Sequence, residues 1–163
     1  MPDVSLYVAV ITGGAAVLGA AVSPVSTAYQ NSRQAVRDRA ERRETAVRQA
    51  CTGLLGSARD VRVQVANTAA YHGAEMASRL EQVRQLDADA ASHADDVALL
   101  VPVSVADSAA RLADAVSRLT AWAETNFKSD LGASIREPDF TDLNERIADF
   151  SIRAVGYLRS SMD

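Results

Sequence analysis

The sequence has few of the residues that interrupt helices and few of those that build β-sheets. Only 4 prolines and 8 glycines occur among 163 residues, and aromatic side chains make up 5% of the chain. No run of alternating β-branched residues lies between turn-forming pairs. The apolar residues are dominated by alanine, which favours helices and allows them to approach closely. These scarcities exclude a β-rich fold and predict an all-α protein.

The residues that carry common chemistry are also scarce. Cys51 is the only cysteine, so no internal disulfide forms, and we expect Cys51 to be a small buried residue. Glycine-rich phosphate loops, cysteine pairs, nucleophile elbows and His-Glu-x-x-His helices are all missing. Asp89, His93 and Asp96 share a helix face and are of metal-ligand type, but a solvated polar face is the better interpretation. We therefore expect no enzyme activity, no cofactor and no metal.

Charge is unevenly distributed along the chain. The net charge is −4, but residues 33–48 hold six arginines and three acidic residues, while the chain after residue 48 holds eleven basic and seventeen acidic residues. An acidic body is unsuited to the phosphate backbone, so we expect no nucleic-acid partner. Lys128 is the only lysine, and arginine supplies the remaining positive charge.

Charged side chains are absent from Val4 to Ser32. At about 1.5 Å per residue, a helix over Leu6–Val25 is long enough to cross the roughly 30 Å hydrocarbon layer of a bilayer. We therefore predict a single transmembrane helix within residues 1–28, with Pro24 marking its end or a kink, followed by a basic juxtamembrane helix over residues 29–46. Small residues spaced four apart favour self-association of the span, and the predicted packing residues are Ala15, Ala16, Gly19 and Ala20.

Basic residues next to a span stay on the cytoplasmic side and attract anionic lipids. The sequence therefore predicts a location in the inner (cytoplasmic) membrane, with the N-terminus outside and the C-terminal body in the cytoplasm. The predicted contacts with the membrane surface are Arg33, Arg37, Arg39, Arg42 and Arg43.

Two alternatives to a membrane span are open. A cleaved secretory signal would explain the small residues Ser26, Thr27 and Ala28, although the segment before the apolar stretch contains Asp3 and no basic residue. A buried hydrophobic helix in a soluble assembly is the other alternative.

Residues 47–163 carry the periodicity of amphipathic helices, with apolar side chains recurring at alternating steps of three and four residues. We predict one helix from Val47, a second that Pro102 ends, a third capped by Ser104 and a fourth capped by Thr141. Residues 127–140 are predicted to be a loop. The predicted inward-facing positions are Val47, Cys51, Leu54, Ala58, Val61, Val65, Ala69, Met76, Leu80, Val83, Leu86, Ala90, Ala94, Val97, Val101, Val105, Ala109, Leu112, Val116, Leu119, Ala123, Leu143, Ile147, Phe150, Ala154 and Leu158.

The pattern is weakest at Asn67–Gly73, where the sequence allows either a turn or an unbroken helix. A turn predicts an antiparallel bundle of about four helices, and an unbroken helix predicts a long stalk with the last two helices folded against it.

The functional expectation is a single-pass, membrane-anchored helical interaction or scaffold protein without catalytic activity. Its expected partners are membrane lipids, an unidentified protein and a second copy of the chain. The alternatives are a membrane-perturbing effector or small pore former that acts through association of its transmembrane helices, and an exported or soluble helical assembly subunit.

Overall fold

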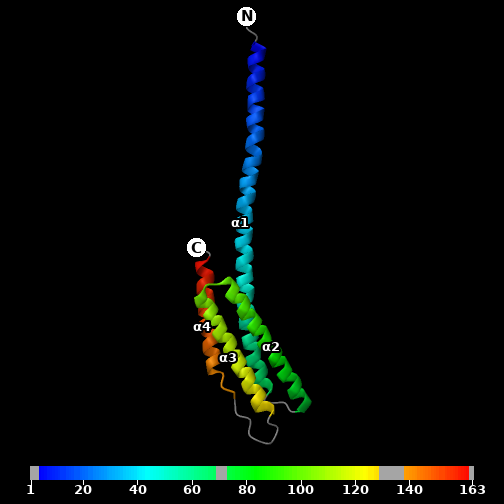
Figure 1. Ribbon diagram of the computed structural model, residues 1–163, viewed down its shortest axis with the longest axis vertical. Coiled ribbons are helices and arrows are strands. Elements are labelled where there is room, and N and C mark those ends of the chain that lie inside the picture. Colours follow the sequence, from blue (N-terminus) through cyan, green and yellow to red (C-terminus); the bar gives the residue numbers. More distant parts are fainter. Residues whose placement is uncertain (1–3, 69–72, 129–137, 162–163) are drawn as a thin grey trace. The chain divides into compact units, whose positions relative to one another are not determined.

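The computed structural model describes the backbone of residues 4–68, 73–128 and 138–161, and the side chains of residues 31–68, 74–127 and 138–161. It contains four helices: α1 (Val4–Thr68), α2 (Gly73–Leu100), α3 (Val103–Lys128) and α4 (Thr141–Ser160) (Figure 1). None of the described residues forms a strand, and the predicted all-α class is confirmed.

The chain divides into two compact units, residues 1–42 and residues 43–163. The first unit contains the N-terminal part of α1. The second unit contains the remainder of α1 together with α2, α3 and α4, and it forms a helical bundle. The predicted domain boundaries at residues 28 and 46 stay predictions.

Side chains that join neighbouring helices show that the bundle is antiparallel. In the second unit α2 packs on α3, and α3 packs on α4. Arg84 on α2 pairs with Glu124 on α3, whereas Asp87, further along α2, accepts a 2.7 Å hydrogen bond from Ser117, which is earlier on α3. Because the residue numbers of the paired side chains rise along α2 and fall along α3, the two helices run in opposite directions.

The last part of α1 lies beside both α2 and α4. Arg43 donates to the carbonyl oxygen of Leu100 at 3.2 Å, and Gly53 lies against His93. At the other end of this segment, Arg62 Nη1 donates to Asn144 Oδ1 at 2.8 Å. These contacts close the bundle, so that each helix has two neighbours.

The core follows the predicted periodicity. Leu54, Leu112 and Phe150 are 0% exposed, and each belongs to the buried stripe of a different helix. Alternating steps of three and four residues keep apolar side chains on one helix face, which is why the sequence pattern locates the core. Leu86, Val101, Ile147 and Leu158 are only partly buried, and Ala69 lies outside the described residues. The other predicted positions are buried: Val47, Cys51, Leu54, Ala58, Val61, Val65, Met76, Leu80, Val83, Ala90, Ala94, Val97, Val105, Ala109, Leu112, Val116, Leu119, Ala123, Leu143, Phe150 and Ala154.

The structure decides between the two interpretations of residues 67–73. α1 ends at Thr68, α2 begins at Gly73, and the two helices lie antiparallel, so the unbroken stalk is wrong and the four-helix bundle is confirmed. Residues 69–72 lie outside the described residues. Pro102 ends α2 as predicted, because α2 stops at Leu100 and a proline restricts the residue before it.

Both predicted N-caps are wrong by one residue or more. The Pro102 carbonyl accepts the first hydrogen bonds of α3, from residues 105 and 106, so Ser104 lies inside the helix. Phe140 is the N-cap of α4 and its own side chain makes no capping hydrogen bond, so Thr141 is the first helical residue. Its backbone N–H instead donates to Asp139 Oδ1 at 2.9 Å, which satisfies one free donor of the first turn.

The predicted loop over residues 127–140 begins too early. Phe127 is 2% exposed and still helical, and its ring meets the ring of Trp122 edge-on, with centroids 5.6 Å apart. Burial of Phe127 against Trp122 favours a helix that continues to Lys128. Residues 129–137 lie outside the described residues.

Helix α1 also differs from its prediction. Its backbone is helical on both sides of Pro24 and continues through residues 29–46 into the bundle, so a helix end at Pro24 is wrong. Over the part of the chain searched, which is the described part, no helix is both long and apolar enough to span a bilayer. The side chains of the Leu6–Val25 stretch lie outside the described residues.

Candidate functional site

Helices α1 and α2 approach closely where α1 carries a glycine. A Cβ atom on residue 53 would lie 2.7 Å from Cε1 and 2.7 Å from Nε2 of His93, which is closer than non-bonded atoms come. The imidazole of His93 therefore fills the space that a side chain at Gly53 would take. Gly56, one turn later, has no atom within 4 Å of its Cβ position, so the close approach is local to Gly53.

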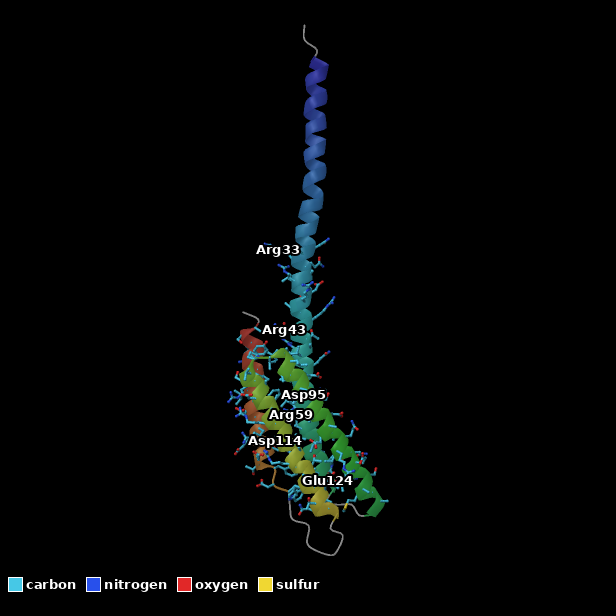
Figure 2. All side chains as sticks on the ribbon, viewed as in Figure 1. Arg33, Arg43, Arg59, Asp95, Asp114 and Glu124 are labelled. Atoms are coloured by element: carbon cyan, nitrogen blue, oxygen red, sulfur yellow. The ribbon has the colours of Figure 1, made fainter. Side chains whose placement is uncertain are left out.

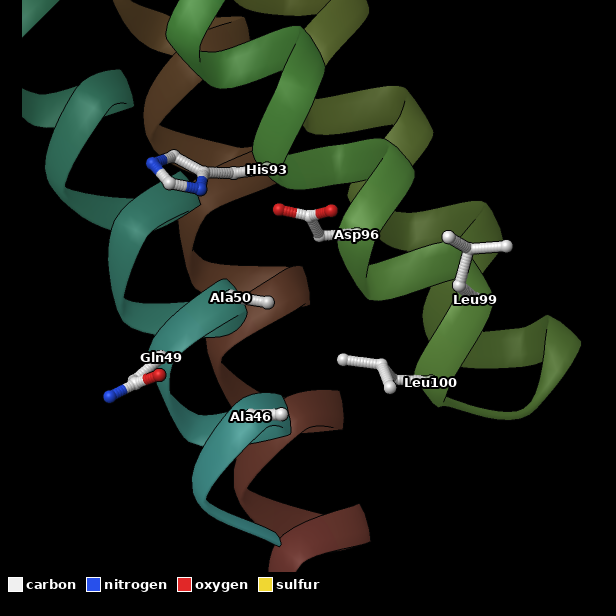
Figure 3. Close-up of a pocket in the computed structure, with 7 residues that line it drawn as sticks. All are labelled: Ala46, Gln49, Ala50, His93, Asp96, Leu99 and Leu100. Carbon is white, nitrogen blue, oxygen red and sulfur yellow. The ribbon is translucent and has the colours of Figure 1, made fainter. Parts of the chain in front are cut away.

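Beside His93 an open groove of about 410 Å³ lies between the two helices. This volume is at the lower end of the range for pockets that bind small molecules or side chains. Figure 3 shows that the groove walls come from two helices, with His93 extending from α2 toward α1. The lining residues are Ala46, Gln49 and Ala50 on α1 and His93, Asp96, Leu99 and Leu100 on α2.

The groove combines apolar walls with a few polar atoms. His93 Nδ1 is buried and has no hydrogen-bond partner, while the carboxylate of Asp96 and the amide of Gln49 belong to exposed residues. The Asp96 carboxylate and the Gln49 amide together offer both donors and acceptors to a bound group. These residues can bind and orient a ligand, and they do not form a nucleophile with its base.

One end of the groove lies where α2 ends. The Leu99 side chain is 84% exposed at the rim, and the guanidinium of Arg43 donates to the Leu100 carbonyl. The last carbonyl groups of a helix have no partner within the helix, so Arg43 stabilises the end of α2. The predicted contact of Arg43 with the membrane surface stays a prediction.

The rest of the bundle surface carries charged side chains, as Figure 2 shows for Arg59 on α1, Asp95 on α2, and Asp114 and Glu124 on α3. Most ion pairs join residues four apart on one helix, such as Arg153 and Asp149 at 2.9 Å. Exposed pairs of this kind contribute little to stability. The sequence-level interpretation of Asp107, Arg111, Asp114 and Arg118 as a solvent face is confirmed, since all four are exposed.

The other predicted site residues fall in the first unit. Arg33, Arg37, Arg39 and Arg42 are exposed on α1. At about 100° per residue, Arg33 and Arg37 lie on one side of the helix and Arg39 and Arg42 on the other. The predicted packing residues of the span, Ala15, Ala16, Gly19 and Ala20, lie outside the residues whose side chains are described.

The structure does not bring Asp89, His93 and Asp96 together as ligands. Asp89 accepts a 3.1 Å hydrogen bond from Gln85, and the His93 ring is directed at Gly53. Across the described residues, no group of three or more histidine, cysteine or acidic side chains has the geometry to hold a metal ion.

Sequence reasoning missed the groove. A signal was available, because Ala46, Ala50 and Gly53 are small residues spaced four and three apart on the buried side of α1, the spacing that allows close helix approach.

No protein-family model, no curated protein and no solved structure matches this chain.

Proposed function

We propose that this chain is a membrane-anchored interaction protein, in which residues 6–25 cross the bilayer and the bundle of residues 43–163 binds a partner on the cytoplasmic side. The observation that carries the anchor is the stretch Val4–Ser32, which has no charged residue and is followed by the arginine-rich segment 33–48. The backbone of this stretch is helical, and a helix satisfies its own peptide groups in hydrocarbon.

The rise of a helix assigns different depths to the arginines of the first unit. Arg33 follows Val25 by about 12 Å along a straight helix, and Arg42 follows it by about 25 Å. The headgroup layer is only about 5–8 Å thick on each side. Because a long arginine side chain extends back toward the phosphates, Arg33 and Arg37 are the residues placed to bind lipid. Arg39 and Arg42 then lie beyond the headgroups and act through longer-range attraction.

The groove between α1 and α2 is the proposed partner site. Its occupant is an apolar side chain of a partner polypeptide, held between Ala46, Ala50 and Leu100. Asp96 is exposed and lines the groove, so a basic or amide group next to that apolar side chain finds a carboxylate acceptor. An anchor that concentrates the bundle at the membrane raises the effective concentration for such a partner.

Flotation of membranes in a density gradient without detergent tests the anchor. The full chain is expected to float with the lipid. Leu18→Arg is expected to remove most of the chain from the floating fraction, because a charge at the centre of a span costs about 2.5–3.5 kcal/mol. Val36→Arg is the matched control, since Val36 is 64% exposed and follows the apolar segment. Equal flotation of Leu18→Arg and Val36→Arg would contradict the anchor.

Site-specific photo-crosslinking in cells tests the groove. A photoreactive residue at Leu99 should give a discrete adduct of the full chain, and Ala46→Trp, which fills the mouth of the groove, should abolish that adduct. Val63 is the control position, because it is 51% exposed on α1 and does not line the groove. The groove is not the partner site if the Leu99 adduct persists in Ala46→Trp while circular dichroism shows an intact fold.

A further inference from the structure

Helix α4 exposes an apolar position on the face opposite to its core. Leu143, Phe150 and Ala154 are buried in the bundle, while Ile152 is 73% exposed. At about 100° per residue, the buried residues cluster on the side of α4 opposite to Ile152. A β-branched side chain with this exposure keeps most of its apolar surface in solvent, so the face around it is free for a partner.

The residues around Ile152 form a narrow stripe that is symmetric along the helix. Ala148 and Gly156 lie four residues before and after Ile152, and Glu145 and Arg159 lie seven residues before and after it. The other four residues lie within about 40° of Ile152 around the helix axis, and all five are exposed. The stripe therefore has a large apolar residue at its centre, small residues on both sides and opposite charges at its two ends.

The two end charges differ from the other charges of α4. Asp142 pairs with Arg118 and Arg146, and Asp149 pairs with Arg153. Glu145 and Arg159, by contrast, form no ion pair with any residue that the structure describes. The two α4 side chains left for an outside partner thus carry opposite signs and lie at equal distances from Ile152.

We propose that this stripe, residues 145, 148, 152, 156 and 159, is a homodimer interface in which two α4 helices pair antiparallel about a two-fold axis through Ile152. In this register Ile152 meets Ile152 of the second copy, Ala148 faces Gly156, and Glu145 faces Arg159. Small residues opposite one another let the helices approach closely, and both end pairs are attractive. A parallel pairing would instead place Glu145 on Glu145 and Arg159 on Arg159, which is repulsive.

The inference uses only the second unit and does not rest on the proposed membrane anchor. One helix pair buries less area than a standard interface of about 1,600 Å², so the dissociation constant is expected to be roughly micromolar. Arg43, which begins this unit, lies at the end of the bundle where α2 ends. An antiparallel pair therefore presents the two copies of Arg43 at opposite ends.

Charge reversal tests the register with the full chain in detergent, using sedimentation to measure dimerisation. Glu145→Arg alone and Arg159→Glu alone should each weaken the dimer about tenfold, since each change creates two repulsive pairs. The double variant Glu145→Arg with Arg159→Glu should restore the original affinity, because it re-forms both pairs with the signs exchanged. Single variants that dimerise like the original chain, or a double variant that stays weak, would overturn the proposal.

Cysteine crosslinking tests the axis in a Cys51→Ala background. Ile152→Cys should crosslink to itself, because it lies on the two-fold axis, and a mixture of Ala148→Cys and Gly156→Cys chains should crosslink to each other. Ala148→Cys alone should not, since its two copies are about 12 Å apart along the helices. Leu99→Cys is the exposure control, being 84% exposed and outside the stripe. Self-crosslinking of Ala148→Cys would show a parallel pair, and crosslinking of Ile152→Cys no faster than Leu99→Cys would show no pair at this face. Either result would overturn the proposal.

Discussion

Arg118 on α3 donates a 2.7 Å hydrogen bond from Nη2 to Oδ2 of Asp142 in the first turn of α4. This bond, together with the positive charge of Arg118 and a second pair with Arg146, holds the pKa of Asp142 below its ordinary value. A carboxylate beside the N-terminus of a helix is also favoured by the helix dipole. The pair therefore links two helices only while Asp142 is ionised.

Removal of Arg118 should destabilise the bundle in a pH-dependent way. A carboxyl group whose pKa is lowered on folding contributes stability above its unfolded pKa of about 3.9, and the contribution is lost as the pH falls through the lower folded pKa. The difference in unfolding free energy between the original chain and Arg118→Gln should thus be largest above the unfolded pKa and should shrink as the pH falls through the lowered folded pKa.

Urea denaturation at a series of pH values, followed by circular dichroism, measures this difference. Arg153→Gln is the control, because Arg153 pairs with Asp149 on the same helix and joins no second helix. A difference for Arg118→Gln that stays constant with pH would contradict the role assigned to Asp142.

The contact between Gly53 and His93 predicts opposite effects for the same substitution at two glycines. Gly56→Ala should stabilise the chain by about 0.5–1 kcal/mol, because alanine favours the helix and its Cβ meets no atom there. Gly53→Ala should instead destabilise it, since overpacking against the imidazole costs about 1–3 kcal/mol.

A double-mutant cycle separates the clash from helix propensity. In a His93→Ala background the clash is gone, so Gly53→Ala should become stabilising by up to about 1 kcal/mol, with a coupling energy of about 1 kcal/mol or more between the two positions. Thermal unfolding of the four chains measures it. Additive effects of the two substitutions on the free energy of unfolding would show that the His93 imidazole moves away from residue 53 without an energetic cost.

The single cysteine provides a reporter of bundle opening. Cys51 is 4% exposed, and burial raises the pKa of its thiol above the ordinary value. Since the thiolate is the reactive form, native chains should react with a thiol reagent at least about 100-fold more slowly than chains in urea at the same pH. Because folding raises the pKa of the Cys51 thiol, the contribution of this group to the free energy of unfolding is complete below its unfolded pKa of about 8.5. This contribution is lost as the pH rises further.

Alkylation followed by mass spectrometry measures this rate. Leu54→Ala, which leaves a cavity one turn away, should speed the reaction by lowering the cost of opening, whereas Leu99→Ala at the exposed rim should not. Rapid stoichiometric labelling of the native chain would show that Cys51 is accessible.

The stripes of the core could be predicted from the sequence because they depend on spacing alone. Positions such as Val61, Leu112 and Phe150 recur with the helical period, and each is 0% exposed. The C-terminal end of α2 could also be predicted, because Pro102 prevents the helix from continuing in any surroundings.

Features that depend on contacts between helices could not be predicted. No proline between Thr68 and Gly73 predicts that α1 ends and α2 begins there. The packing of α1 on α2 determines this reversal of the chain. Gly53 lies against His93, a residue forty positions away, and no local pattern specifies that pairing. The helix starts were also misplaced. The Pro102 carbonyl accepts the first hydrogen bonds of α3, and the Asp139 carboxylate, in place of the Thr141 side chain, accepts from the first turn of α4.

Protease digestion of sealed inside-out membrane vesicles that carry the full chain tests the anchored, inward-facing bundle most directly. The account predicts that protease removes residues after Arg33 and leaves a membrane-protected fragment that contains Leu6–Val25, while intact spheroplasts protect the bundle. Full-length chain that remains in the supernatant after ultracentrifugation without detergent, or a bundle cleaved only from the outer face, would contradict it.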